Sequence, residues 1–156
     1  MQTYFALNPI GRAVGAPFTM FLPKLDIARE PDVQVILKSN PGELKRTYMN
    51  GPADVCIEIV SLESGQRDHG AKFEEYEQGG VGEYWIVDPL HRECRFYALD
   101  EAGRYAHRIE DAEGIYRSPR LPGLALHVPT LWNETLPTVP DVLQSLQAML
   151  NPPSAG

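Results

Sequence analysis

Hydrophobic and polar residues alternate along several short stretches of this chain. In residues 54–61 (DVCIEIVS), Val55, Ile57 and Ile59 occupy every second position, which is the period of a β-strand with two different faces. Glu58 stands in the middle of this stretch, between two isoleucines. A carboxylate in such a position is costly unless it has a partner, and Glu58 is therefore a candidate functional residue.

The same criteria predict further strands elsewhere. Residues 12–22 form an extended segment that Gly15 and Pro17 interrupt, which favours an edge strand or a bent strand. DEAG at 100–103 predicts a hairpin turn. The remaining predicted strands lie at residues 32–37, 83–88, 93–99, 104–109, 114–118 and 124–128.

Helices are expected at residues 71–78 and 141–150, and a short exposed helical turn at 41–48. Asp68 is the predicted N-cap of the first helix, and Gly79 is its predicted stop. Because this helix lies between two predicted strands, 54–61 and 83–88, it predicts a right-handed crossover between parallel strands.

These elements predict the α+β class, with a mixed, mostly antiparallel sheet, a crossover helix and a C-terminal helix. The length of 156 residues is typical of one domain. We expect this domain to span residues 1–150, and residues 151–156 to form a flexible tail.

Composition limits the partners. The formal net charge is −7, which argues against strong nonspecific attraction to nucleic acid but allows a local basic groove or a contact bridged by a metal. Cys56 and Cys94 each fall in a predicted strand, which favours buried, reduced thiols and a cytoplasmic location. No apolar run reaches the ~20 residues of a membrane span, so no membrane partner is expected, and no signal peptide is evident at the N-terminus.

Asp32 opens a predicted strand directly after Pro31, and Lys72 falls on the helix that follows the Glu58 strand. Two carboxylates on neighbouring strands could bind a divalent metal, and a lysine could orient water or stabilise charge on a phosphodiester. Simpler interpretations stay open. Asp32 could cap a strand, Glu58 could face solvent or form a salt bridge, and Lys72 could be a solvated helix residue.

Other polar and aromatic residues near these positions have simpler interpretations. Asp54 shares the face of Glu58, but four residues of strand separate the two by ~13 Å. We therefore interpret Asp54 as a residue that caps a loop or supports the site from outside, rather than as a metal ligand. Tyr84 and Trp85 are expected in the core rather than on a base-stacking surface.

Residues 29–89 resemble the Uma family of "putative restriction endonucleases", which belongs to the PD-(D/E)XK nuclease superfamily. The matching segments, in order, are REPDVQVIL at 29–37, GPADVCIEIVS at 51–61 and RDHGAKFEEYEQGGVGEYWIVDP at 67–89. The likeness extends over roughly residues 13–133.

The resemblance implies a restriction-endonuclease-like fold and a metal-dependent nuclease that hydrolyses phosphodiester bonds of nucleic acid, with DNA favoured. Asp32 and Glu58 match the two carboxylates that bind Mg²⁺ or Mn²⁺. The lysine that usually stands two residues after the second carboxylate falls on Val60 here. In this family its role moves to the following helix, which implies Lys72 as the third catalytic residue.

The chain departs from the family in two respects. The resemblance leads us to expect a shortened N-terminal region, and with it the loss of a helix that would cover the sheet. The net charge is also acidic. We therefore expect a homodimer that covers the N-terminal strand or the exposed sheet face. A catalytically inactive, dimeric interaction protein on the same fold stays open as the alternative.

Overall fold

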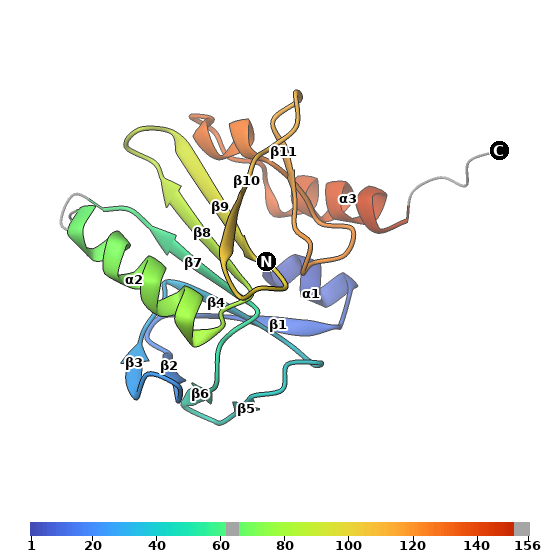
Figure 1. Cartoon of the computed structure of the whole chain (residues 1–156). Helices are drawn as coiled ribbons and strands as arrows, with labels where there is room; N and C mark the ends of the chain where they lie inside the picture. Colours follow the sequence, from blue (N-terminus) through green and yellow to red (C-terminus); the bar gives the residue numbers. More distant parts are fainter. Residues whose placement is uncertain (62–65, 152–156) are drawn as a thin grey trace.

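A six-stranded mixed sheet forms the centre of the molecule (Figure 1). The computed structural model describes residues 1–61 and 66–151. The strand order is β1-β4-β7-β8-β9-β10; β7 and β8 are parallel, and the other neighbours are antiparallel. The strands are β1 (Gly11–Gly15), β4 (Val33–Leu37), β7 (Val55–Ile59), β8 (Glu83–Asp88), β9 (Glu93–Leu99) and β10 (Tyr105–Arg108).

Both faces of this central sheet are covered. On one face lie α1 (Gln2–Leu7), α3 (Val139–Leu150), the pair β11 (Ile115–Arg117) and β12 (Ala125–His127), and a 3-10 helix (Val128–Trp132). On the other face lie α2 (Gln66–Gly79) and a small sheet. Its strand order is β3-β2-β6-β5, made of β3 (Ile27–Arg29), β2 (Thr19–Leu22), β6 (Tyr48–Asn50) and β5 (Glu43–Leu44).

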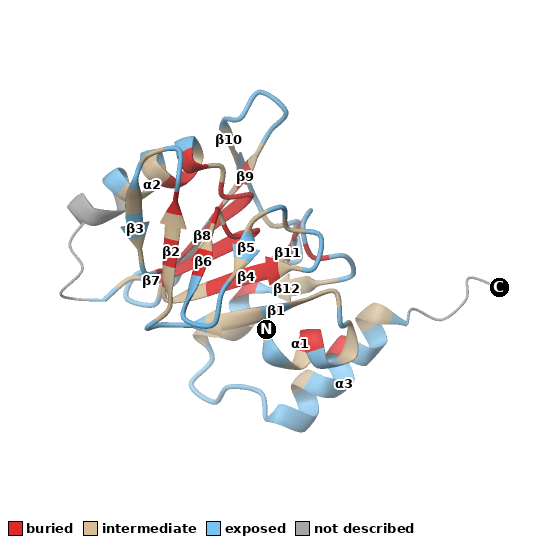
Figure 2. Ribbon diagram, turned by 90° about the horizontal axis from the view of Figure 1, so that it is seen from below, coloured by how far each residue is buried: buried red, intermediate tan, exposed pale blue. Residues whose placement is uncertain are grey.

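The alternation in β7 explains how the strand serves two cores. Val55 and Ile57 belong to the cluster on the α1–α3 face, whereas Cys56 belongs to the cluster on the α2 face. Successive side chains of a strand point to opposite faces, so Glu58 shares the α2 face with Cys56. Figure 2 shows the resulting band of buried central strands between the covering elements.

The predicted crossover is confirmed, because α2 joins β7 to β8 and the two strands are parallel. The predicted stop is also confirmed, since α2 ends at Gly79 and Gly80 has a positive φ of 90°. A Cβ at Gly79 would lie 2.7 Å from Leu22 Cδ1, so glycine permits the close packing of α2 on β2. The predicted N-cap is wrong, because α2 begins at Gln66 and Asp68 lies inside it.

Residues 41–48 do not form the predicted helical turn. They contain β5, which pairs with β6 in the register Leu44↔Met49. Asn40 Oδ1 accepts a hydrogen bond of 2.8 Å from the Gly42 backbone N–H and shapes the entry to β5. Met49 is fully buried, so tertiary pairing outweighs the weak local helical preference.

The C-terminal helix is confirmed, although it begins two residues before the predicted start. Thr138 caps it, in a reciprocal pair of hydrogen bonds with Asp141. Helix α1, which sequence reasoning did not predict, packs Tyr4 and Phe5 into the core on the α1–α3 face. Most of the predicted tail, residues 152–156, lies outside the described residues. Among the described helices, none has the length and apolar character needed to cross a membrane.

Candidate functional site

Asp32 and Glu58 face each other across two central strands. The antiparallel register of β4 and β7 pairs Val33 with Ile57. Asp32 directly precedes Val33, and Glu58 directly follows Ile57. An antiparallel pairing continued by one step places two such residues opposite each other, with their side chains on one face. The fold therefore brings together the two carboxylates that the sequence singled out.

Asp32 does more than cap its own strand. Its Oδ2 accepts a hydrogen bond of 2.7 Å from the backbone N–H of Ile59, the residue after Glu58. Its backbone carbonyl accepts another, of 3.0 Å, from the Ala16 N–H beyond β1. The Asp32 carboxylate is thus held against β7, beside Glu58.

Glu58 is almost completely buried, with 4 % of its surface exposed. Its Oε2 accepts a hydrogen bond of 3.1 Å from Lys72 Nζ, and its Oε1 accepts one of 2.8 Å from the Tyr76 hydroxyl. Lys72 and Tyr76 are four residues apart on α2, a spacing that places both side chains on one face of the helix. The crossover helix therefore supplies both of these partners of the buried carboxylate.

The electrostatic balance at Glu58 has opposing parts. Burial raises the pKa of Glu58 above its ordinary value, and the negative charge of Asp32 adds to this. Hydrogen bonds from Tyr76 and Lys72, together with the lysine charge, act to lower the same pKa. A cation close to both carboxylates would favour their ionised forms further.

The position of Lys72 on α2 brings a positive charge to Glu58. Val60, two residues after Glu58, is partly buried against the cluster on the α2 face. The Lys72 ammonium reaches Glu58 from α2 instead. A positive charge therefore reaches Glu58 from α2 rather than from β7.

Sequence reasoning missed Tyr76. This side chain is fully buried and packs edge-on against Tyr84, with ring centroids 5.1 Å apart. Burial raises the pKa of Tyr76, so its hydroxyl keeps its proton and acts as a donor to Glu58. The available signal was its spacing of four residues from Lys72 on a predicted helix.

Several other interpretations are confirmed. Asp54 Oδ2 accepts hydrogen bonds from the Leu37 backbone N–H at 2.7 Å and from Asn40 Nδ2 at 2.8 Å, so Asp54 fixes a loop at the other end of β7. Tyr84 and Trp85 are core residues, with 0 % and 2 % of their surface exposed.

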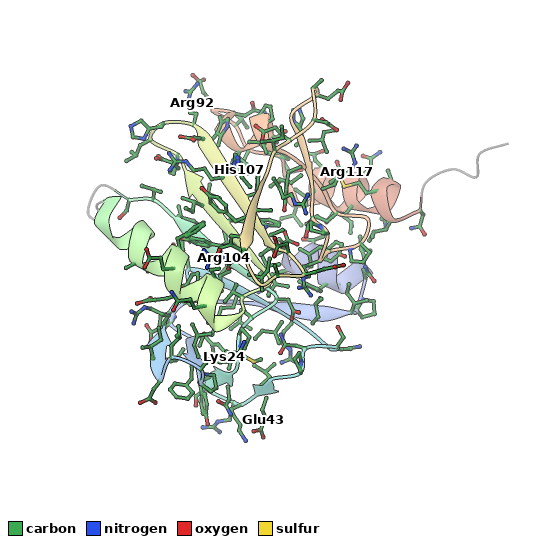
Figure 3. The ribbon with its side chains drawn as sticks, in the orientation of Figure 1. Lys24, Glu43, Arg92, Arg104, His107 and Arg117 are labelled. Atoms are coloured by element: carbon green, nitrogen blue, oxygen red, sulfur yellow. The ribbon has the colours of Figure 1, made fainter. Side chains whose placement is uncertain are left out.

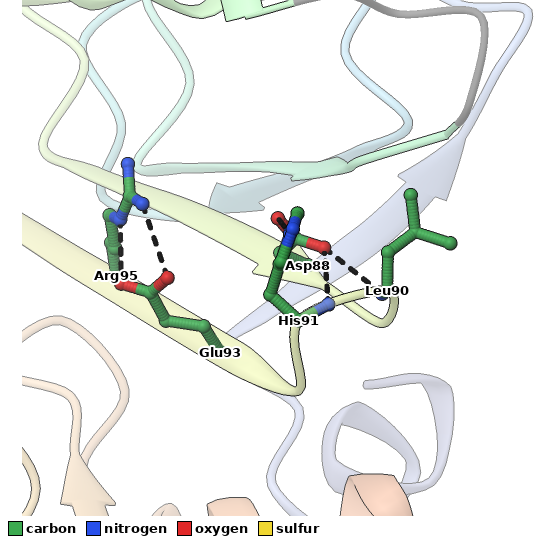
Figure 4. A network of polar contacts seen from close by, with 5 residues as sticks. All are labelled: Asp88, Leu90, His91, Glu93 and Arg95. Carbon is green, nitrogen blue, oxygen red and sulfur yellow. Dashed lines mark hydrogen bonds and ion pairs between the residues drawn. The ribbon is translucent and has the colours of Figure 1, made fainter.

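Asp88, the last residue of β8, organises the β8–β9 turn (Figure 4). Its Oδ1 accepts from the backbone N–H groups of Leu90 and His91 at 3.0 and 3.1 Å. Its Oδ2 lies 2.8 Å from His91 Nδ1. These contacts hold the turn between β8 and β9.

The donor set at the site consists of oxygen atoms. Among the described residues, no group of three or more His, Cys, Asp or Glu side chains is placed to hold a metal ion. Mg²⁺ is commonly bound through one or two carboxylates and keeps several waters. Asp32 and Glu58 fit such an ion, and they do not fit a zinc site closed by protein ligands.

A family model described as "Putative restriction endonuclease", Uma2, matches residues 2–129. The chain belongs to the Uma2 family. The match covers the central sheet, α2 and the candidate site, so the sequence resemblance is confirmed over most of the chain.

Among solved structures, a crystal structure described as a putative nuclease belonging to DUF820, from Anabaena variabilis, is similar to this chain. The similarity covers 84 % of this chain and 73 % of that one, with a TM-score of 0.68 and 18 % sequence identity. It shows a shared nuclease-like α+β fold. None of the curated proteins compared with the chain gave a significant match.

Proposed function

We propose that this protein is a metal-dependent nuclease that hydrolyses phosphodiester bonds of nucleic acid, with DNA as the substrate. The observation that carries the proposal is the arrangement of Asp32 and Glu58 on one sheet face with Lys72 in contact with Glu58. Membership of a family described as "Putative restriction endonuclease" supports the choice of DNA. The unpaired state of both cysteines supports a cytoplasmic location, because disulfides are rare there.

Hydrolysis adds water across a P–O bond, so the site must position the water and stabilise negative charge on the phosphate. Asp32 and Glu58 would hold Mg²⁺ or Mn²⁺, which on binding supplies a more acidic water and positive charge beside the phosphate. The Lys72 ammonium, already oriented by Glu58, would orient the attacking water or stabilise the developing charge. Tyr76 holds Oε1 of Glu58 and so limits the rotation of the carboxylate.

The test is Mn²⁺ titration by calorimetry together with cleavage of plasmid and single-stranded DNA. Glu58→Gln and Asp32→Asn should lose both metal binding and cleavage, because each removes a charged ligand. Lys72→Met should keep metal binding but lose cleavage by about 10²-fold or more, the scale found when a charge-stabilising donor is removed.

Glu93→Gln is the matched control, because Glu93 is an exposed strand carboxylate paired with Arg95. It should bind Mn²⁺ and cut like the wild type. If the wild type neither binds Mn²⁺ nor cuts, the Lys72–Glu58 contact is a structural ion pair. The alternative, an inactive interaction protein on the same fold, then replaces the nuclease proposal.

A further inference from the structure

Arg29 and Glu75 form an ion pair between β3 and α2. Arg29 Nε donates to Glu75 Oε2 at 2.6 Å, and a terminal guanidinium nitrogen of Arg29 donates to Oε1. The two side chains are 34 % and 23 % exposed. Such paired hydrogen bonds are strong and set a defined orientation for the guanidinium.

Both residues of this pair lie close in sequence to residues of the candidate site. Arg29 precedes Asp32 by three residues, and Glu75 follows Lys72 by three residues on α2. Helix residues three apart are surface neighbours, with Cβ atoms about 5–6 Å apart. The pair bridges β3 and α2, two elements that Figures 1 and 2 show side by side over the central sheet.

Because the surroundings of Arg29 are acidic, its positive charge would favour the approach of nucleic acid. The whole chain carries a net charge of −7, and α2 has Glu74, Glu75 and Glu77 after Lys72. Glu77 already contacts Arg104 and the Tyr105 backbone N–H. A nucleic-acid backbone that approaches this acidic helix needs compensating positive charge. A guanidinium can donate two parallel hydrogen bonds to two oxygens of a phosphate, just as it does to the two oxygens of a carboxylate.

We propose that Arg29 binds a backbone phosphate of the nucleic acid next to the phosphodiester at the site, and that Glu75 holds the guanidinium until the phosphate replaces it. This inference rests on the proposed function. Glu75 acts as a competitor of the substrate. Its carboxylate orients Arg29 in the free protein, and it opposes phosphate binding because it occupies the guanidinium N–H groups that the phosphate would use.

The competition separates this role from a purely structural one. If Arg29 binds phosphate, Arg29→Gln weakens DNA binding and Glu75→Gln strengthens it, because Glu75→Gln removes the competing charge. If the pair only joins β3 to α2, both variants lower the melting temperature, and they do not change DNA affinity in opposite directions.

The experiment measures binding of a fluorescent DNA duplex by anisotropy, over a range of salt concentrations. The proteins carry the Lys72→Met background with Mg²⁺ present, so that binding is recorded with little cleavage. Arg29→Gln should weaken binding by about tenfold, the effect of one lost charge-assisted contact. It should also reduce the slope of log affinity against log salt by about one. Arg29→Lys keeps the charge but loses the paired hydrogen bonds of the guanidinium. Its DNA affinity should therefore lie between that of the background protein and that of Arg29→Gln.

Two variants serve as matched controls. Glu74→Gln removes the same charge from an exposed neighbour of Glu75, so Glu75→Gln should strengthen binding by more than Glu74→Gln does. Arg117 pairs with Asp111 and lies on the other side of the molecule from α2 in Figure 3. Arg117→Gln should leave DNA affinity unchanged.

The outcomes separate this inference from the proposed function. If neither the wild type nor the Lys72→Met protein binds DNA at low salt, the proposed function and this inference fail together. If the background protein binds and Arg29→Gln binds equally well, only the role of Arg29 is overturned. The same follows if Glu75→Gln weakens binding as much as Arg29→Gln, since the intact pair would then be what binding requires.

Discussion

At the scale of single residues, Glu58 determines the character of the site. It is a carboxylate buried on a strand, and its oxygens accept hydrogen bonds from a lysine and a tyrosine of the next helix. Burial of the charge costs free energy that these partners offset only in part. That balance allows the carboxylate to respond to pH and to cations.

The raised pKa of Glu58 predicts a specific pH dependence of stability. Its ordinary pKa is 4.5, and burial raises the pKa in the folded state. The folded protein therefore binds the proton more tightly than the unfolded chain does. Stabilisation from the protonated group is complete in acid below 4.5 and is lost as pH rises through the folded pKa.

Glu58→Gln removes this titration. We expect the free energy of unfolding of the wild type, relative to Glu58→Gln, to fall as pH rises from about 4 to neutral, and to level off above the folded pKa. Urea unfolding of both proteins across this range measures the difference. A difference that stays constant with pH would show that burial does not perturb Glu58.

At the scale of elements, a second buried carboxylate joins the β11 region to the central sheet. Glu83, at the start of β8, is fully buried on the α1–α3 side. Its oxygens accept hydrogen bonds of 2.6 to 2.8 Å from four donors. These are Trp85 Nε1, the Tyr116 hydroxyl, Ser118 Oγ and the Arg120 backbone N–H.

Replacement of Glu83 should therefore be costly without touching the candidate site. Glu83→Gln directs an amide N–H₂ toward groups that are themselves donors, so buried donors lose their acceptor. We expect a loss of about 3 kcal/mol in the free energy of unfolding, measured in urea. The exposed Glu93→Gln should lose less than about 0.5 kcal/mol. Equal losses in the two variants would contradict this account of Glu83.

At the scale of the whole molecule, both faces of the central sheet are covered. Helix α1 lies on the α1–α3 face, opposite the face that carries Asp32 and Glu58. The sheet face is therefore not the open surface that the sequence led us to expect. In the order of the central sheet, β1 is an edge strand that pairs with β4 alone.

We expect a homodimer formed through this edge, because the unpaired N–H and C=O groups of an edge strand can pair with a second copy. Light scattering at micromolar concentration should give twice the chain mass. Arg12, exposed near the centre of β1, would approach its own copy across a two-fold axis. Arg12→Ala should then strengthen the dimer by removing like-charge repulsion. A monomer mass for both proteins would contradict the proposal.

Local patterns alone determined much of this protein. The alternation around Glu58 identified β7, and Gly79 identified the end of the helix that returns the chain to a parallel strand. Asp32, Glu58 and Lys72 could be singled out because each falls at a recognisable place in a strand or helix pattern, and the family resemblance linked the three.

Tertiary structure decided what no local pattern carries. Residues 41–48 contain strand β5 because β6 offered a pairing partner. Tyr76 donates a hydrogen bond to Glu58 because α2 packs over β7. The Arg29–Glu75 pair joins residues 46 positions apart. Contacts of this kind depend on how whole elements pack, and the free energy that selects them comes from burial and long-range pairing rather than from neighbouring residues.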